Sequence, residues 1–477
     1  MHNAGTEIKN IFKFSISTWV NFVVGFISTF VLTRIFLPEV LGVINLFYST
    51  VSTLMSFFCF GLDSALIRYF YKPPQNEKTS LFIFNLILPC ILTTILVGGI
   101  SILFWGSGIA GFFLGRNETL LCLFIVISVI DQIFLRYLNI IYRMETKIKD
   151  YNVQSIIINI VTKLSVILGV LVDASSPIYA LLFNVLMVSL VTIYYCYIQN
   201  KEWVARDQPF DYSGYHDVFK FAFWGWISMF VLQVYMLSSQ LIVNNKLDLN
   251  AVGIFTSAGF FSAVITAARG GFCTYWSAFM YKNYTVSDQQ SFIRNMHDVI
   301  TYLCIILCAF LFSFRSVIYL FIGEEFRSSM AFFSLLIIFP VLQTIQETTA
   351  YGINIENKNY IYTIVYSITL AINVGGGLLF VKNYGMTGVA FANFLSAIVC
   401  FSATSIVGQK LYKSITYWRK TLIGIILLLI EGLVPVFIES DWELIIWMAA
   451  IMLLSTILYK DIIEYAKNLI TKRFSNR

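Results

Sequence analysis

Apolar segments of about twenty residues follow one another along almost the whole chain. A membrane-spanning α-helix needs about 20 predominantly apolar residues. Measured by that length, the chain contains fourteen such segments, at residues 11–34, 42–66, 80–106, 118–142, 152–172, 176–199, 217–244, 251–280, 296–321, 329–353, 360–381, 386–409, 420–438 and 442–459. The sequence therefore predicts an all-α integral membrane protein with about 14 transmembrane helices.

The amino-acid composition also indicates an integral membrane protein. Hydrophobic residues make up 58% of the chain and charged residues only 12%, against about 25% charged in a typical soluble domain. The mean hydropathy is +0.77. These values exclude a soluble globular enzyme, a disordered chain, a collagen and a disulfide-rich secreted scaffold. The eight cysteines lie in apolar segments and the three histidines are scattered, so we expect neither a metal site nor another cofactor.

The basic residues predict the orientation in the membrane. The net charge is +6, and most Lys and Arg residues fall in alternate loops if both termini are cytoplasmic, as the positive-inside rule requires. This distribution explains the charge without nucleic acid as a partner. The first apolar segment, preceded by Lys9 and Lys13, is too long for a signal-peptide core and is expected to be retained. The connections are short and leave no room for an extramembrane domain.

An internal repeat is indicated by residues 210 or 211 positions apart. The matches are Gly42 with Gly253, Tyr71-Lys72 with Tyr281-Lys282, Met144-Glu145-Thr146-Lys147 with Ile355-Glu356-Asn357-Lys358, and Tyr179-Ala180 with Val389-Ala390. Because six helices are an even number, two six-helix halves keep the same orientation. Parallel repeats of this kind are typical of transporters. We predict an N-terminal six-helix lobe at residues 1–200, a C-terminal lobe at 201–412, and two additional helices with a cytoplasmic tail at 413–477.

Ionisable residues within the apolar segments are the candidate functional residues, because a charge at mid-bilayer costs at least about 2.5–3.5 kcal/mol. Lys163 shares a helical stripe with Ser155, Asn159 and Thr162, and Arg269 shares one with Ser262 and Thr266. No acid lies on either stripe, which favours a functional role for both cations. A structural salt bridge, for instance between Lys163 and Asp131, is the alternative.

Neutral polar stripes have a simpler explanation. Asn21 lies on a stripe with Thr18, Gly25 and Ser28 in the first segment, and such residues commonly hydrogen-bond between neighbouring helices. Glu347 is the best candidate for ion coupling, although an ordinary hydrogen-bonded glutamate fits nearly as well. Two or more cations facing one cavity would suit an anionic substrate, above all a diphosphate.

Several loop motifs resemble those of a known family. Residues 30–42, Phe-Val-Leu-Thr-Arg-Ile-Phe-Leu-Pro-Glu-Val-Leu-Gly, resemble the first helical hairpin of Wzx-type polysaccharide flippases of the multidrug/oligosaccharidyl-lipid/polysaccharide exporter superfamily. The family form is T-R-x-L-x-P-x-x-F-G, and this chain has Phe36 and Leu41 at its Leu and Phe positions. Further similar segments are residues 61–68, 143–147 and 384–390. The acidic-basic pair that many relatives carry in the seventh helix is replaced here by Ser238-Ser239-Gln240.

The resemblance implies a V-shaped fold of two lobes, similar to that of MATE transporters, in the bacterial inner membrane. It implies alternating access and a cargo of undecaprenyl-diphosphate-linked oligosaccharide, of O-antigen or capsule type. Lys163 and Arg269 would hold the diphosphate, with Arg34 or Arg68 at the rims and Asn21 in the substrate path. Glu347 or Asp131 would couple an ion. A polysaccharide polymerase and a chain-length regulator are implied as partners, besides the membrane lipids.

Three other functions remain open at this stage. A drug or cation antiporter of the same superfamily would favour an acidic cavity, whereas the two deepest charges are basic. A cell-wall precursor flippase also often has fourteen helices. A membrane enzyme, such as a polymerase or an acyltransferase, would need a large external loop or an intramembrane histidine, and only His297 is near a suitable position. We find no catalytic motif and expect a protein that is not an enzyme.

Overall fold

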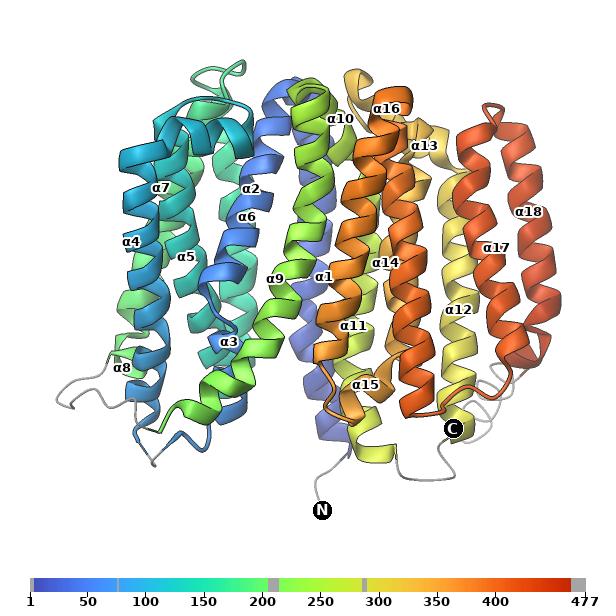
Figure 1. Cartoon of the computed structure of the whole chain (residues 1–477), viewed down its shortest axis with the longest axis horizontal. Coiled ribbons are helices and arrows are strands. Elements are labelled where there is room, and N and C mark those ends of the chain that lie inside the picture. The colour runs from blue at the N-terminus through green and yellow to red at the C-terminus, as the bar shows by residue number, and fades with distance from the viewer. Residues whose placement is uncertain (1–3, 75–76, 205–213, 285–289, 465–477) are drawn as a thin grey trace. The chain divides into compact units, whose positions relative to one another are not determined.

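The computed structural model describes residues 4–74, 77–204, 214–284 and 290–464. The predicted cytoplasmic tail after residue 464 lies outside the described residues. Within the described residues every regular element is a helix (Figure 1). The all-α prediction is confirmed.

The chain divides into two compact units. Unit 1 comprises residues 1–257 and 362–374, and unit 2 comprises residues 258–361 and 375–477. The helices up to the change of unit are α1 (Ala4–Ile35), α2 (Pro38–Phe58), α3 (Leu62–Tyr69), α4 (Thr79–Leu114), α5 (Thr119–Met144), α6 (Ile148–Val170), α7 (Pro177–Ile198), α8 (Asn200–Trp203), α9 (His216–Lys246) and α10 (Leu249–Ala258). In unit 1, α6 packs between α1 and α7, and α2 packs against α5 and α9.

Unit 2 contains the remaining helices and part of α16. They are α11 (Phe260–Asn283), α12 (Gln290–Ser313), α13 (Arg315–Tyr319), the 3-10 helix η3 (Glu324–Ala331), α14 (Phe333–Thr349), α15 (Tyr351–Ile355), α16 (Tyr360–Leu411), α17 (Trp418–Phe437) and α18 (Asp441–Leu458). Here α14 packs against α11, α12 and α17, while α18 packs against α12 and α17. The lobe boundaries expected at residues 200 and 412 stay predictions, since these units are defined by packing and not by the repeat.

The number of membrane crossings is close to the fourteen predicted. Twelve helices of the described residues are long and apolar enough to span a bilayer, and the bent pair of η3 and α14, with an angle of 65°, makes a thirteenth. The 52-residue α16 is interrupted at Gly385, whose φ is 54° and ψ is −135°. Its two parts pack against each other at Gly376 and Ala392, and at Gly388 and Phe380. Because α16 folds back, it supplies two crossings, at the residues the sequence predicts.

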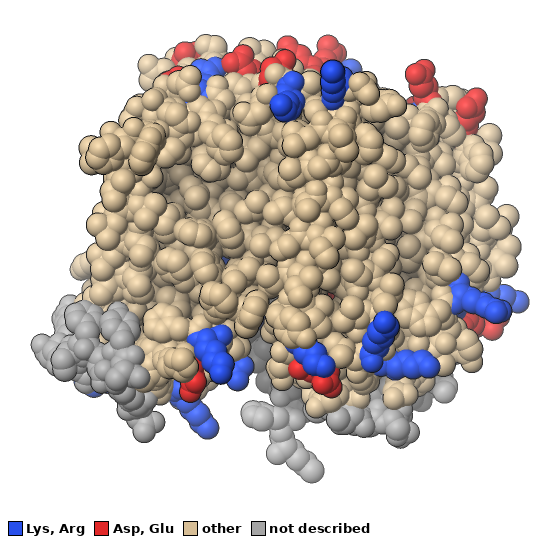
Figure 2. All heavy atoms as spheres, in the orientation of Figure 1, with Lys and Arg blue, Asp and Glu red and all other residues tan. Residues whose placement is uncertain are grey.

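On the visible face of the molecule, charged side chains lie near two opposite edges. On the face shown in Figure 2, Lys, Arg, Asp and Glu residues gather at the two edges, with uncharged residues between. Large apolar side chains such as Leu103, Phe104 and Leu379 are exposed along the helices. In water such a surface would aggregate, whereas in a bilayer it meets lipid. The chain is a multi-pass membrane protein.

One turn of the sequence repeat has the same backbone conformation in both halves. Thr146 and Asn357, which are equivalent positions, both have positive φ values, of 57° and 53°. The hydrogen bonds match as well, because Lys147 N donates to Tyr142 O and Lys358 N donates to Ile353 O, each at 3.0 Å. Two turns with the same unusual backbone and the same bonds identify the loops as copies of one motif.

Equivalent residues of the two repeats also meet each other. A Cβ atom on Gly42 would lie 2.4 Å from Leu249 O, and one on Gly253 would lie 1.9 Å from Pro38 O. Asn45 Nδ2 donates to Thr256 Oγ1 at 2.8 Å, and these two residues are 211 positions apart. The contact between α2 and α10 is therefore reciprocal, as in a two-fold interface. It depends on glycine, because only a residue without a side chain allows this backbone approach.

We predict that Gly253→Ala destabilises the protein by about 1–3 kcal/mol, the usual cost of overpacking. The new methyl group would overlap Pro38 O and force α2 away from α10. The measurement is thermal unfolding in detergent, followed with a thiol-reactive dye that reports exposure of buried cysteines such as Cys59 and Cys90. Gly225→Ala is the control, because a Cβ at Gly225 meets nothing within 4 Å. Equal stability of the two variants would contradict the close contact.

Candidate functional site

Lys163 of α6 lies half-buried within a membrane-spanning segment. Its Nζ is 5.7 Å from the centroid of the Tyr48 ring, within range of a cation–π interaction. Among the described residues, no Asp or Glu forms an ion pair with it. A single aromatic ring compensates an ammonium group only in part, so Lys163 keeps a capacity to bind an anion.

The predicted alternative for Lys163, a salt bridge with Asp131, is not found. Asp131 of α5 is buried, with 6% exposure. Its Oδ2 accepts a hydrogen bond from Ser189 Oγ of α7 at 2.6 Å. Asp131 therefore joins α5 to α7, and its role as an ion-coupling residue stays a prediction.

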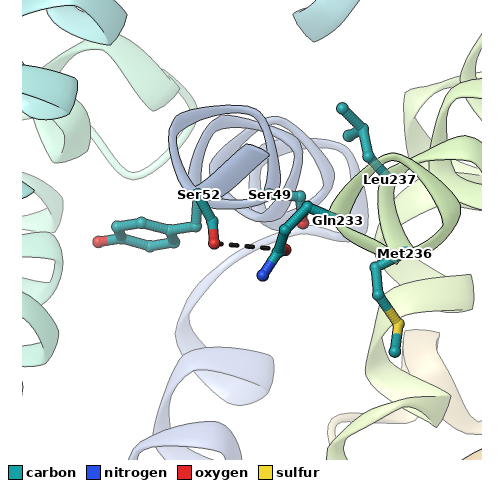
Figure 3. Close-up of a pocket in the computed structure, with 6 residues that line it drawn as sticks. Ser49, Ser52, Gln233, Met236 and Leu237 are labelled. Atoms are coloured by element: carbon teal, nitrogen blue, oxygen red, sulfur yellow. Dashed lines mark hydrogen bonds between the residues drawn. The ribbon is translucent and has the colours of Figure 1, made fainter. Parts of the chain in front are cut away.

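Tyr48 also lines a pocket in unit 1. The pocket has a volume of about 210 Å³ and is formed by Tyr48, Ser49 and Ser52 of α2 with Gln233, Met236 and Leu237 of α9. Figure 3 shows Ser52 and Gln233 meeting across it, where Ser52 Oγ donates to Gln233 Oε1 at 3.5 Å. Hydroxyl and amide groups thus line the pocket together with Tyr48, and the Lys163 ammonium lies close to the Tyr48 ring. Sequence reasoning missed this pocket, although the polar spacing of Ser49 and Ser52 was a detectable signal.

Asn21 of α1 belongs to the same part of unit 1. Its Nδ2 donates to Ser155 Oγ at 2.9 Å, and its backbone carbonyl accepts from Asn159 Nδ2 at 3.0 Å. Both partners lie on the α6 stripe that carries Lys163. The neutral polar residues of this stripe therefore hydrogen-bond to a neighbouring helix, as such residues commonly do. Asn21 Oδ1 is buried without a hydrogen-bond partner in the described structure.

Arg34 and Arg68 lie at exposed ends of helices. Arg34 is in the last turn of α1. Arg68 is in the last turn of α3, where its guanidinium lies 4.4 Å from the centroid of the Phe221 ring. Their assignment to the rims of a substrate path stays a prediction.

Arg269 and Glu347 form an ion pair in unit 2. Arg269 of α11 donates to Glu347 Oε1 of α14 through Nη2 at 2.7 Å and through Nε at 3.1 Å. Its Nη1 donates to Gln343 Oε1 at 2.7 Å. The side chains are 28% and 21% exposed. The predicted substrate-binding cation and the predicted ion-coupling acid thus neutralise each other, which a search for acids on the same helix could not reveal.

Unit 1 has a corresponding pair with the charges exchanged. Arg136 of α5 donates to Asp63 Oδ2 of α3 at 2.7 Å. Arg136 and Glu347 are equivalent in the repeat, being 211 positions apart, as are Gln132 and Gln343. The place occupied by a cation in the first half is therefore occupied by an acid in the second. Sequence reasoning did not find this pairing because the partners come from different helices.

His297 has the surroundings of a structural residue. It is fully buried, and its two ring nitrogens lie 2.8 Å from Thr348 Oγ1 and 3.0 Å from Thr421 Oγ1. Both nitrogens are thus used to join α12 to α14 and α17. The residue considered for an acyltransferase therefore has no ring nitrogen left for a substrate.

We predict that Arg269→Ala lowers stability by about 1.5–3 kcal/mol, the range for hydrogen bonds to charged groups. The substitution leaves the Glu347 carboxylate partly buried without its counter-charge. Lys163→Met should leave stability unchanged or raise it slightly, because no acid loses a partner. Thermal unfolding in detergent distinguishes the two. A loss of stability for Lys163→Met as large as that for Arg269→Ala would show that Lys163 has a structural partner.

The sequence of this chain matches one protein-family model. A family model described as "Polysaccharide biosynthesis protein" matches residues 8–279, more than half of the chain. A comparison with curated protein sequences gives no match.

Solved structures share the fold. "Lipid II flippase MurJ, inward closed conformation" is 15% identical, with a TM-score of 0.67, and the match covers 94% of this chain and 99% of that chain. An inward-facing multidrug resistance MATE family transporter of the MOP superfamily is also 15% identical, with a TM-score of 0.58 and coverage of 83% and 96%. An outward-facing MATE transporter is 14% identical, with a TM-score of 0.57 and coverage of 84% and 95%. The predicted MATE-like fold is confirmed.

Proposed function

Because the chain belongs to the polysaccharide biosynthesis protein family, we propose that it is a flippase for undecaprenyl-diphosphate-linked oligosaccharide repeat units of O-antigen or capsule type. It would move them by alternating access from the cytoplasmic to the outer leaflet of the bacterial inner membrane. The family and the fold support a membrane flippase or transporter. The cargo is the one that the resemblance of the loop motifs implies, and the chemistry of the candidate site is compatible with its diphosphate.

The observation that carries this proposal is Lys163, a cation in a membrane span without a paired acid in the described structure. A charge at this depth is costly and is usually retained for a ligand or a conducted species. An ammonium group binds phosphate oxygens as a point charge. A lipid-linked diphosphate would supply the missing anion, while its polyprenyl chain stays in the surrounding lipid.

The adjacent pocket suits part of a sugar headgroup. Ser49, Ser52 and Gln233 offer hydroxyl and amide groups to sugar hydroxyls, and Tyr48 offers an aromatic face. A volume of about 210 Å³ is below the usual range for drug-sized ligands. The pocket would therefore receive one portion of the headgroup, and Asn21, with its unpartnered Oδ1, would contact it from α1.

Arg269 would act at another step of the cycle. In the conformation described its guanidinium is held by Glu347 and Gln343. Binding of a proton or a sodium ion to Glu347 would release Arg269 toward a diphosphate, and this exchange would be the coupling role of Glu347. Asp131 is the second candidate for ion coupling, and Arg34 and Arg68 would guide the headgroup at the rims. A polysaccharide polymerase and a chain-length regulator would act on the flipped product.

A second candidate is a cell-wall lipid precursor flippase, which the likeness to MurJ favours. Both cargoes contain a diphosphate and would use Lys163 in the same way. A MATE-like drug antiporter fits less well, because the unpaired intramembrane charge in unit 1 is a cation. The loop motifs of residues 30–42 and 384–390 favour the polysaccharide branch over both alternatives.

We expect a strain lacking this gene to lose surface polysaccharide while repeat units accumulate on undecaprenyl diphosphate. Flipping lies after assembly of the unit and before its polymerisation, so only this defect gives both changes. The measurement is quantification of surface glycan together with mass spectrometry of extracted lipid-linked oligosaccharides. Normal surface glycan with altered drug sensitivity would support the antiporter, and accumulation of cell-wall precursor would support the second candidate.

We also expect Lys163→Ala to lose at least tenfold of the flipping rate in proteoliposomes loaded with the lipid-linked oligosaccharide. One lost charge-assisted hydrogen bond to phosphate, worth about 1.5–3 kcal/mol, corresponds to a factor of ten or more. Lys163→Arg should keep part of the activity. Lys246→Ala is the matched control, because Lys246 is exposed in the last turn of α9. Full activity of Lys163→Ala at normal protein level would refute the assignment.

A further inference from the structure

Glu431 of α17 is a fully buried carboxyl group within a membrane span. Its exposure is 0%, and it lies six residues before the end of the helix at Phe437. Neither Oε1 nor Oε2 has a hydrogen-bond partner among the described residues. At 1.5 Å per residue, the group is about 9 Å from the helix end.

The other buried acids among the described residues have polar partners. Asp63 is paired with Arg136, and Asp131 accepts a hydrogen bond from Ser189. Asp298 of α12 lies 2.9 Å from Lys420 Nζ. Three other buried acids thus have an ion pair or a hydrogen bond. Glu431 has neither among the described residues and requires its own explanation.

The groups that the described structure places near Glu431 and its neighbour Gly432 carry no positive charge. Cys304 and Cys308 of α12 lie near it and are buried thiols. On α14, Ser334 Oγ donates to Gly432 O instead, at 2.8 Å. Ile338 of α14 and Phe394 of α16 lie where a Cβ on Gly432 would meet them.

Arg315, a cation at this end of α17, already has other partners. Arg315 of α13 is 4% exposed. It donates to the carbonyl oxygens of Pro435, Ile438 and Glu439, and its Nε lies 3.1 Å from Asp441 Oδ1 of α18. Arg315 therefore caps the C-terminus of α17 and pairs with Asp441.

The backbone adds a further acceptor at the same residue. Pro435 follows Glu431 by four positions within α17. Proline has no N–H, so the carbonyl oxygen of Glu431 receives no helical hydrogen bond. A protonated carboxyl group offers one O–H donor, whereas an ionised one would only add negative charge to a site already rich in unpaired oxygens.

We propose that Glu431 is a proton-binding site, which holds a proton in the conformation described and releases it when α17 separates from α12 and α14 far enough to admit water. Burying an isolated carboxylate costs so much that the group becomes neutral instead. A bound metal cation fits less well, because the neighbouring Cys304 and Cys308 sulfur atoms are soft ligands that hard cations avoid. The link from this proton to transport rests on the proposed flippase function.

The first test needs no substrate. Infrared spectra of the full-length protein in lipid nanodiscs at neutral pH should contain a carbonyl band of a protonated carboxylic acid that Glu431→Gln removes. Glu443→Gln is the matched control, because Glu443 is exposed in the first turn of α18. It should leave this band unchanged. Loss of a carboxylate band in Glu431→Gln, with no change in the acid band, would overturn the proposal.

A second measurement on the wild-type protein covers the case in which Glu431→Gln fails to fold. Dicyclohexylcarbodiimide is lipid-soluble and modifies protonated carboxylic acids. Mass spectrometry should locate the N-acylurea adduct at Glu431, with labelling that falls as pH rises. Labelling that is blocked by Na⁺ at constant pH, or an adduct found only at other acids, would overturn the assignment to a proton.

The link to transport is tested separately in proteoliposomes. Flipping of the lipid-linked oligosaccharide by the wild type should respond to an imposed pH gradient, and Glu431→Gln should weaken that response while Glu443→Gln keeps it. Unchanged pH dependence in Glu431→Gln would overturn the coupling. If the wild type shows no flipping but the infrared band and the adduct are present, the proposed function fails and the proton site stands.

Discussion

The lack of water in the hydrocarbon core of a bilayer is the constraint on which this structure depends. Each polar group within a span must find its partner inside the protein, or remain unpaired at a cost. Most do find one. Arg269 is held by Glu347 and Gln343, and His297 is held by two threonine hydroxyls. Against this background an unpaired ionisable group is informative, and two such groups among the described residues are Lys163 in unit 1 and Glu431 in unit 2.

The repeat shows which features the fold requires and which are free to change. The turn at Thr146 and its copy at Asn357 keep the same backbone and the same hydrogen bonds, because the chain must reverse in the same way in both halves. The ion pairs between helices are not copied. Arg136 pairs with Asp63 in the first half, whereas its equivalent Glu347 pairs with Arg269 in the second. A charge pair stabilises a helix contact whichever helix carries the cation, and the second partners, Asp63 and Arg269, lie at different positions of the repeat.

Much of the fold could be predicted from sequence because the relevant information is local. Segment length and hydropathy predict spans, and the glycine at 385 marks where α16 folds back. The candidate site was predicted only in part. Lys163 and Arg269 were both recognised as intramembrane cations, but their different environments depend on other helices. Glu347 lies 78 positions from Arg269, and no spacing rule connects them. Glu431 escaped notice because a single acid in an apolar segment has no pattern, and its burial without a partner is visible only in three dimensions.

Charge balance explains why an ion-coupled cycle would use both an unpaired cation and an ion pair that can open. A diphosphate esterified at both ends carries two negative charges, and Lys163 offers one positive charge. The Arg269–Glu347 pair contributes nothing to this balance while it is intact, since its charges cancel. Under the proposed function, binding of the coupling ion to Glu347 would free Arg269 to bind the diphosphate at another step of the cycle. Ion binding would then strengthen substrate binding at that step, and by linkage substrate binding would strengthen ion binding to the same extent. Glu431 has no such counter-charge, so its proton would respond to the opening of the helices around it and not to the cargo.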